Sequence, residues 1–205
     1  MFNSRDTDME YDDDFDEDLP DIEDYPTLIS VVRFNKLIPS IPWFNEVGEP
    51  LDQDSLIAAR DYMEGLGFPG AFVAEVESWE DAAYAAANPE FNSEWWDAEE
   101  QLRMALTTSA LELMSEEDLN LALTHVSATA SDIINSAVEV ATSDAVVEDQ
   151  ELIRAAVGSA LQSCHQAALV LAAGEEDSHP FALKYKLFEH GHWPIAITGN
   201  SFNIF

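Results

Sequence analysis

Residues 116–142 carry apolar side chains at the spacing of one continuous helix face. The intervals between these residues alternate between four and three, which keeps them on one side of an α-helix for about six turns. Ser115, followed by Asp118, resembles a capping box in which Asp replaces the usual Glu or Gln, and it marks the start of the helix. The expected buried residues are Leu119, Leu123, Val126, Ala130, Ile133, Ala137 and Val140.

A second long helix is predicted from about Glu148 to residue 173, with Gly174 as its stop. The loop at 143–145 is short, so the two helices are expected to be antiparallel neighbours. Ala and Ser are frequent on both stripes and allow the helices to approach closely. The second stripe consists of Ile153, Val157, Ala160, Cys164, Ala168 and Leu171.

Shorter elements surround this pair. Residues Thr27–Ile38 are rich in β-branched and apolar side chains and predict a strand. Turn and capping residues predict three further helices before the long pair and one after it. The first covers 54–64, is capped by Asp52 or Asp54 and is ended by Gly65, and the second is Trp79–Ala87. The third is capped by Ser93 and precedes the 116–142 helix, and it carries Trp95, Trp96, Leu102, Leu106, Ala110 and Leu113. The fourth follows the long pair, starts at Ser178 and Pro180, and ends at Gly191.

The last residues, WPIAITGNSFNIF, predict a β-hairpin. Gly199–Asn200 fits a two-residue type II′ turn, which pairs Thr198 with Ser201, Ile197 with Phe202, and Ile195 with Ile204. One face of the hairpin is then apolar, and Phe205 is expected to be packed. The predicted fold class is mainly α: a helical bundle with two long antiparallel helices and a small C-terminal β-hairpin.

Charge divides the chain into two predicted parts. Residues 1–25 hold twelve Asp and Glu against one Arg and form an acidic segment that we expect to be flexible when free. Residues 26–205 are predicted to form a single mainly helical domain, which still has 29 acids and seven bases. Stretches 61–102 and 104–153 contain no Lys or Arg. Such a surface repels nucleic acid and anionic membranes and attracts basic proteins.

The acidic segment also contains apolar side chains. Tyr11, Phe15, Leu19 and Ile22 follow at steps of four, four and three, although Pro20 disfavours one continuous helix. Alternation of acidic and apolar residues is typical of segments that dock on a basic surface with apolar pockets. The alternative is that these residues fold back onto their own domain or form a solvated tail without a binding role. The candidate partner contacts are Tyr11 and Phe15 as anchors, with Asp12, Asp13, Asp14, Asp16, Glu17 and Asp18.

Candidate catalytic residues are few. Cys164 is the single cysteine and lies on an apolar stripe, so it is expected to be a core residue, and its helical neighbour His165 points about 100° away. His190 and His192 flank Gly191, with His179 nearby in sequence, but the pair straddles a helix end. No phosphate-binding loop or nucleophile elbow is present. We therefore predict no enzyme activity, no metal and no cofactor.

The sequence favours a protein that binds and masks a basic partner. An inhibitor, an immunity protein or a nucleic-acid mimic would fit, acting on a nuclease, a toxin or a nucleic-acid-binding protein without touching nucleic acid or membrane itself. The alternatives are a salt-adapted protein, whose charge says nothing about partners, and a bundle-type enzyme that uses the His179, His190 and His192 region. Because no signal-peptide pattern opens the chain, a cytoplasmic location is expected. The oligomeric state stays open.

Overall fold

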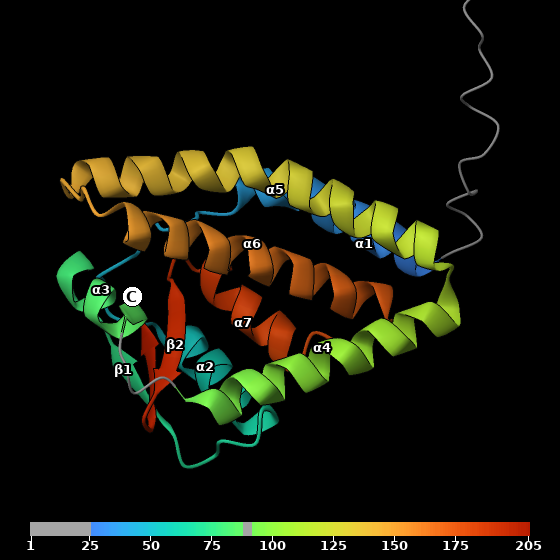
Figure 1. Ribbon diagram of the computed structural model, residues 1–205, viewed down its shortest axis with the longest axis horizontal. Helices are drawn as coiled ribbons and strands as arrows, with labels where there is room; N and C mark the ends of the chain where they lie inside the picture. The colour runs from blue at the N-terminus through green and yellow to red at the C-terminus, as the bar shows by residue number, and fades with distance from the viewer. Residues whose placement is uncertain (1–25, 88–91) are drawn as a thin grey trace, which may run out of the picture.

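A computed structural model describes residues 26–87 and 92–205, and the fold of this part is mainly α, as predicted (Figure 1). The described residues contain seven α-helices, one short 3₁₀ turn and a three-stranded sheet, joined by loops. No helix among them is long and apolar enough to cross a lipid bilayer. The elements are α1 (Pro26–Leu37), the 3₁₀ turn η3 (Ile38–Ser40), α2 (Gln53–Gly65), β1 (Phe72–Glu75), α3 (Trp79–Ala87), α4 (Ser93–Leu113), α5 (Glu116–Asp144), α6 (Gln150–Ala172), α7 (Pro180–Glu189), β2 (Pro194–Thr198) and β3 (Ser201–Ile204).

The predicted pair of long antiparallel helices is present as α5 and α6, which pack along one another (Figure 1). The predicted stripe of α5 is correct only as far as Ala130. Beyond it the buried residues are Ile134, Val138 and Thr142, whereas Val140 is 59% exposed. Rows of residues four apart incline across a helix surface, so the buried face shifts around α5 where it crosses its neighbours. Ile133 and Ala137 lie at the margin of the core.

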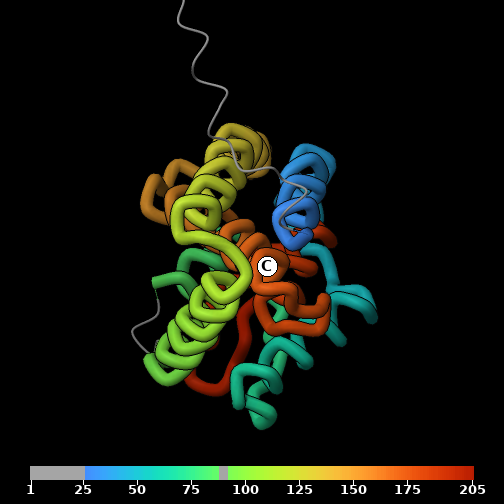
Figure 2. The backbone as a smooth tube through the Cα atoms, turned by 90° about the vertical axis from the view of Figure 1, so that its right-hand side faces the viewer, coloured from blue at the N-terminus to red at the C-terminus, as the bar shows by residue number. Residues whose placement is uncertain are grey.

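Helix α6 is more deeply enclosed than one stripe predicts. Ile153, Val157 and Leu171 are only partly buried, while Leu152 and Ala156 are buried. From residue 166 to 170 every side chain is buried. The cause is position, because α1, α4, α5 and α7 all contact α6. Figure 2 shows α1 and α5 at one end of the molecule and α2 and α4 at the other, with α6 and α7 between them.

The strand predicted at Thr27–Ile38 is wrong, because this stretch forms α1 and the η3 turn. Leu28, Val31, Phe34 and Ile38 are buried at helical spacing, and α1 packs against α5 and α6. Burial of one helical face therefore outweighs the weak β preference of the β-branched side chains.

The helix starts and stops elsewhere mostly follow the prediction. The Asp52 side chain caps α2 by accepting from Ser55 N at 2.7 Å, and α3 has the predicted bounds. Ser115 Oγ accepts from Asp118 N at 3.1 Å, as a capping box requires. The predicted cap of α4 is one residue off, since Asn92 rather than Ser93 caps the helix. On α4, Trp96 and Leu113 are about half exposed rather than core.

The C-terminal hairpin is present, with one correction. Thr198 pairs with Ser201 and Ile197 with Phe202, but a bulge makes Pro194, not Ile195, the partner of Ile204. Gly199 adopts φ 57°, the left-handed conformation that the first position of a type II′ turn needs. Phe205 is 2% exposed, and its backbone pairs with that of Trp193 in both directions. The last residue is therefore packed, as predicted.

A third strand was not predicted from the sequence. β1 pairs in parallel with β3, so the sheet order is β1-β3-β2 and β1 lies at an edge. One face of the sheet carries Phe202 and Ile204, which join a second hydrophobic core with residues of α2 and α4. This second core lies apart from the larger one around α5 and α6.

Candidate functional site

The residues predicted to bind a partner, Tyr11, Asp12, Asp13, Asp14, Phe15, Asp16, Glu17 and Asp18, lie outside the described residues. Their prediction rests on sequence alone. The other candidates can be placed in the fold.

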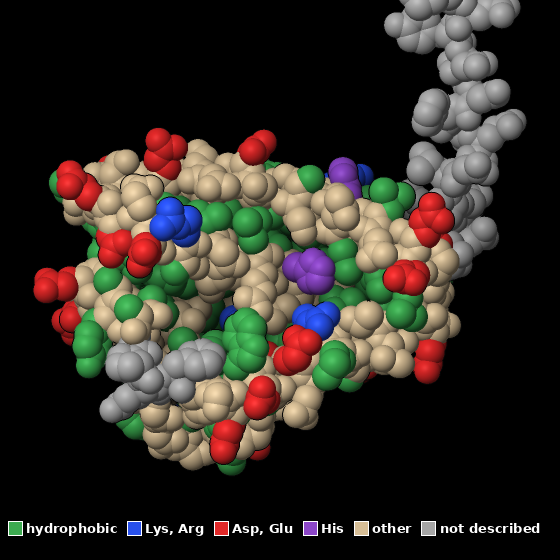
Figure 3. Space-filling model, in the orientation of Figure 1, with side chains coloured by type: hydrophobic (Ala, Val, Ile, Leu, Met, Phe, Trp, Pro, Cys, Tyr) green, Lys and Arg blue, Asp and Glu red, His purple; other side chains and the backbone are tan. Residues whose placement is uncertain are grey.

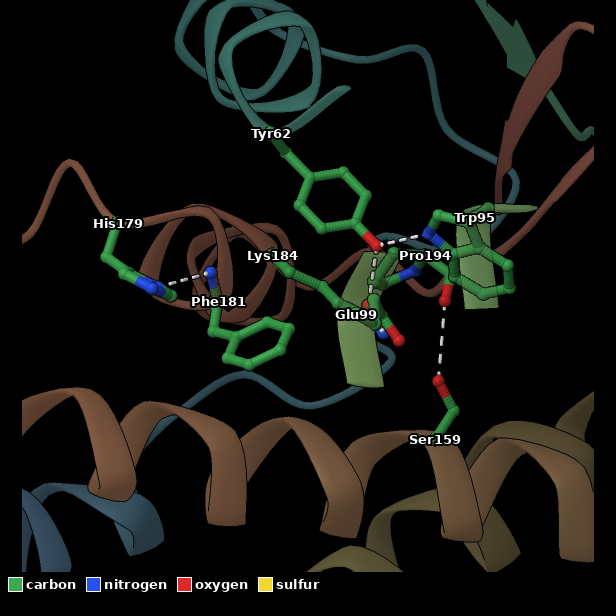
Figure 4. Close-up of polar contacts among 8 residues, drawn as sticks. All are labelled: Tyr62, Trp95, Glu99, Ser159, His179, Phe181, Lys184 and Pro194. Carbon is green, nitrogen blue, oxygen red and sulfur yellow. Dashed lines mark hydrogen bonds and ion pairs between the residues drawn. The ribbon is translucent and has the colours of Figure 1, made fainter. Parts of the chain in front are cut away.

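The three histidines of the alternative enzyme hypothesis are not brought together. His179 caps the start of α7, where its Nδ1 accepts from Phe181 N at 3.1 Å (Figure 4). His190 and His192 follow the opposite end of the same helix. His192 is 4% exposed, and burial lowers its pKa. Within residues 26–87 and 92–205, no three His, Cys, Asp or Glu side chains are grouped closely enough to hold a metal ion.

His190 contacts Ser55 and Asp52, but the geometry does not suit a catalytic triad. Ser55 Oγ lies 2.8 Å and Asp52 Oδ1 3.4 Å from the same ring atom, Nδ1. A triad needs the serine on one ring nitrogen and the carboxylate on the other. Ser55 is also fully buried, out of reach of a substrate. These contacts tie the start of α2 to the end of α7.

Cys164 is a core residue, as predicted. It is fully buried, and burial raises its pKa to about 12. Its thiol is therefore protonated near neutral pH and unsuited to nucleophilic attack.

Four side chains form a buried polar cluster that the sequence analysis did not single out. Figure 4 shows Tyr62 from α2, Trp95 and Glu99 from α4, and Lys184 from α7 pointing toward one another. Glu99 Oε1 accepts from Lys184 Nζ at 2.7 Å and from Tyr62 OH at 2.6 Å. Trp95 Nε1 donates to Tyr62 OH at 2.7 Å. All four residues are at most 4% exposed.

Electrostatics favours an ion pair at the centre of this cluster. Lys184 Nζ also lies 5.4 Å from the centroid of the Trp95 ring, within the range of cation–π attraction. Burial, reinforced by the charge of Glu99, raises the pKa of Tyr62 well above its usual value, so the phenol stays neutral and donates.

The cluster holds three helices together and has a small cavity beside it. The second carboxylate oxygen, Glu99 Oε2, and Gln166 Oε1 have no hydrogen-bond partner among the described residues. Both residues line a cavity of about 10 Å³ between α4 and α6, which holds nothing larger than a water molecule. The four side chains therefore join α2, α4 and α7.

The exposed surface offers a different kind of site. The described residues contain 28 Asp and Glu, of which 25 are exposed, and seven Lys and Arg, of which four are exposed. Figure 3 shows carboxylates spread over one face of the molecule with few cations among them. Lys184 is buried against Glu99, and Arg103 forms a bidentate ion pair with Glu100 on α4. Little positive charge is thus left to balance the carboxylates.

One part of this surface is concave, and we call it the acidic hollow. It measures about 260 Å³ and lies between α3 and the sheet. Its carboxylates come from Glu75, Glu77 and Asp81, and the Tyr84 ring beside them is 72% exposed. No Lys or Arg lines it. An anionic hollow with an aromatic wall is suited to a cationic side chain.

Comparisons with models of known protein families, with curated proteins and with solved structures found no match.

Proposed function

We propose that this protein binds a basic protein and masks its cationic surface. The observation that carries the proposal is the charge of the exposed surface, where 25 carboxylates face four cations in the described residues. Residues 1–25 add twelve acids and one Arg. A field of this sign and extent accelerates association with cationic proteins.

The proposed mode of action is competition. Carboxylates take the places of phosphate groups on a partner that binds nucleic acid or an anionic substrate, so the partner's site is blocked. Charge alone accelerates association but gives a short-lived complex, and apolar contacts between the charges supply the affinity. Tyr11 and Phe15 in the acidic segment are the proposed anchors, flanked by Asp12, Asp13, Asp14, Asp16, Glu17 and Asp18. Such a protein is an inhibitor, an immunity protein or a nucleic-acid mimic, and its role requires no catalytic residue, metal or cofactor.

The test begins with capture from an extract of the native cells, washed at rising salt. A basic protein that stays bound after non-specifically bound cationic proteins have washed off is then purified. Its binding to this protein is measured, and its activity is measured with and without this protein. We expect a complex that forms more slowly as salt rises, and loss of the partner's activity within it. If captured basic proteins all wash off at low salt, or stay fully active when bound, the proposal fails.

Salt adaptation is the second candidate, because the same excess of exposed carboxylates is expected in a concentrated-salt cytoplasm. It predicts that the free protein unfolds when salt is removed, since carboxylates then repel one another without screening. Thermal melting at low and high salt distinguishes the two. If the protein melts at nearly the same temperature at low and at high salt, the masking proposal is retained.

A further inference from the structure

Among the described residues, the edge strand β1 leaves part of its backbone unpaired. Phe72 N donates to Asn200 O at 3.1 Å and Val76 N to Ile204 O at 2.8 Å, so alternate residues of β1 face β3. The N–H and C=O groups of Val73 and Glu75 therefore face the opposite side. Among the residues that the structure describes, none pairs its backbone with those groups. We call these groups the free edge.

An apolar groove borders the free edge. It measures about 440 Å³, lies between α2 and β1, and carries one cation, Arg60, and one anion, Glu64. The Phe72 side chain at its rim is 57% exposed. Strand edges are usually protected by short length, charged side chains, Pro or a covering element. β1 is only four residues long and ends in Glu75, but none of its own residues is Lys or Pro. The apolar side chains of the β1–α2 groove are Leu56, Met63, Phe68, Pro69, Ala71, Phe72 and Val73.

The two ends of β1 differ in charge. The β1–α2 groove borders the first half of the strand and is electrically balanced. The acidic hollow borders the second half, beginning at Glu75. Glu77 and Asp81 contribute carboxylates there, the Glu75 carboxylate accepts a hydrogen bond from Leu51 N at 3.3 Å, and no described Lys or Arg lines the hollow. A segment that lies along the free edge thus meets an apolar surface first and then a strongly anionic one.

We propose that an extended segment of the basic partner adds to the free edge of β1 as a further strand. The inference rests on the proposed function and names the chemistry of the contact. Backbone groups of the segment pair with Val73 and Glu75, an apolar side chain enters the β1–α2 groove, and a Lys or Arg reaches the acidic hollow. A second copy of this chain is disfavoured as the occupant, because edge-to-edge pairing would bring two sets of these carboxylates together.

The first experiment uses a short peptide of alternating lysine and valine, labelled with a fluorophore. Its control is the same peptide with an N-methyl group on every residue, which keeps the side-chain charge and removes the backbone donors of both edges. We expect the methylated peptide to bind at least about tenfold more weakly, because a strand cannot form. Equal binding of both peptides at moderate salt would show a purely electrostatic contact and overturn the inference.

The second experiment changes the protein. Val73→Pro removes a donor of the free edge without breaking a bond to β3, and we expect it to weaken peptide binding about tenfold. Circular dichroism and melting establish that the variant is folded; if it is not, Phe72→Asp, at an exposed position of the groove, replaces it with the same expectation. Glu77→Lys in the acidic hollow should weaken binding more than Glu80→Lys, which makes the same charge change on α3 outside the hollow.

The outcomes separate this inference from the proposed function. If the full-length partner binds but these variants bind it and the peptide as the parent does, the free edge is not the docking surface and the masking role stands. If no basic partner is retained but the unmethylated peptide binds more tightly than the methylated one, the free edge is a peptide-binding site and the masking proposal fails. Concentration-dependent dimers that Val73→Pro abolishes would assign the edge to a second copy and overturn the inference.

Discussion

A buried ion pair matters most when one of its partners is removed. Glu99 and Lys184 lie at most 4% exposed and share their hydrogen bonds with Tyr62. Taking two charges out of water costs several kcal/mol per ion, and their attraction offsets this cost only while both are present. The pair therefore specifies how α2, α4 and α7 fit together more than it adds to net stability.

Replacing Lys184 by Met should lower the free energy of unfolding by about 3–5 kcal/mol, because it leaves the Glu99 carboxylate buried without its cation. Urea denaturation measures the change. The matched control is Glu100→Gln, the next residue of α4, whose ion pair with Arg103 is partly exposed and should be worth no more than about 1 kcal/mol. The double variant Glu99→Leu with Lys184→Met should recover much of the loss. Equal effects of the two single variants would contradict the structural role of the cluster.

Cys164 should be unreactive in the folded protein. With its pKa raised to about 12, only about one thiol in ten thousand is ionised at pH 8, and the side chain is fully buried. A chromogenic disulfide reagent should therefore label the protein only after guanidinium unfolds it. Rapid stoichiometric labelling under native conditions would show that α6 opens far more readily than its packing indicates.

The buried cluster could in part have been predicted from the sequence. Glu99 lies four residues after Trp95 and three before Leu102, and Lys184 lies three after Phe181 and four before Phe188, so each charge sits on an apolar stripe. Two opposite charges at such positions indicate a buried pair. The pairing itself depends on how α4 and α7 meet in space, because 85 residues separate the two partners.

At the scale of elements, α5 shows how far a stripe predicts burial. Ile134 is fully buried, while Val140, on the predicted stripe, is 59% exposed. Ile134→Asp should unfold the protein or lower its stability by several kcal/mol, because the charge is buried without a partner. Val140→Asp makes the same kind of change on the surface and should shift the melting temperature little. Similar melting of both variants would mean that α5 is rotated from the position described.

The sheet and α1 show which parts of the fold local sequence patterns could predict and which they could not. The hairpin was predictable because its turn and pairing are local, and only the bulge at Pro194 shifted the register. Strand β1 was not predictable, because its partner β3 lies about 130 residues away and nothing near Phe72 encodes a parallel pairing. α1 was misassigned because its β-branched side chains suit a strand, while the surfaces of α5 and α6 that bury it are visible only in the fold.

Deleting residues 193–205 should abolish cooperative melting. The deletion removes β2 and β3, exposes β1, and takes Trp193, Ile197, Phe202, Ile204 and Phe205 from the two cores. Losing several large buried side chains costs more than the stability of a typical domain. Differential scanning calorimetry and light scattering record the outcome. A soluble truncated protein with an unchanged transition would show that the hairpin does not support the cores.

For the whole molecule, charge and packing act in different places. The two cores are apolar except for a few buried polar residues such as Glu99 and Lys184, so most of the carboxylates that cover the surface take no part in core packing. Those carboxylates are therefore available to set the rate and salt dependence of association. In the proposed complex, affinity comes from apolar groups, which are Tyr11 and Phe15 in the acidic segment and Phe72 at the free edge.

The acidic segment should make two separable contributions to binding. Changing Asp12, Asp13, Asp14 and Asp16 to Asn should mainly slow association and flatten its salt dependence, because exposed charges steer the encounter and are screened by salt. Changing Tyr11 and Phe15 to Ala should mainly speed dissociation, because aromatic anchors hold a complex together once water is excluded. Kinetic binding to the captured basic partner at two salt concentrations measures both rates.

Deleting residues 1–25 should combine the two effects, and we expect melting to stay intact because the described residues already form two apolar cores. The matched control is Glu139→Gln with Asp132→Asn on α5, which removes exposed charge outside the segment and outside the acidic hollow. Full affinity and an unchanged association rate after the deletion would remove the segment from the interface. Binding would then depend on the folded surface, and Glu77→Lys should weaken it while Glu80→Lys does so less.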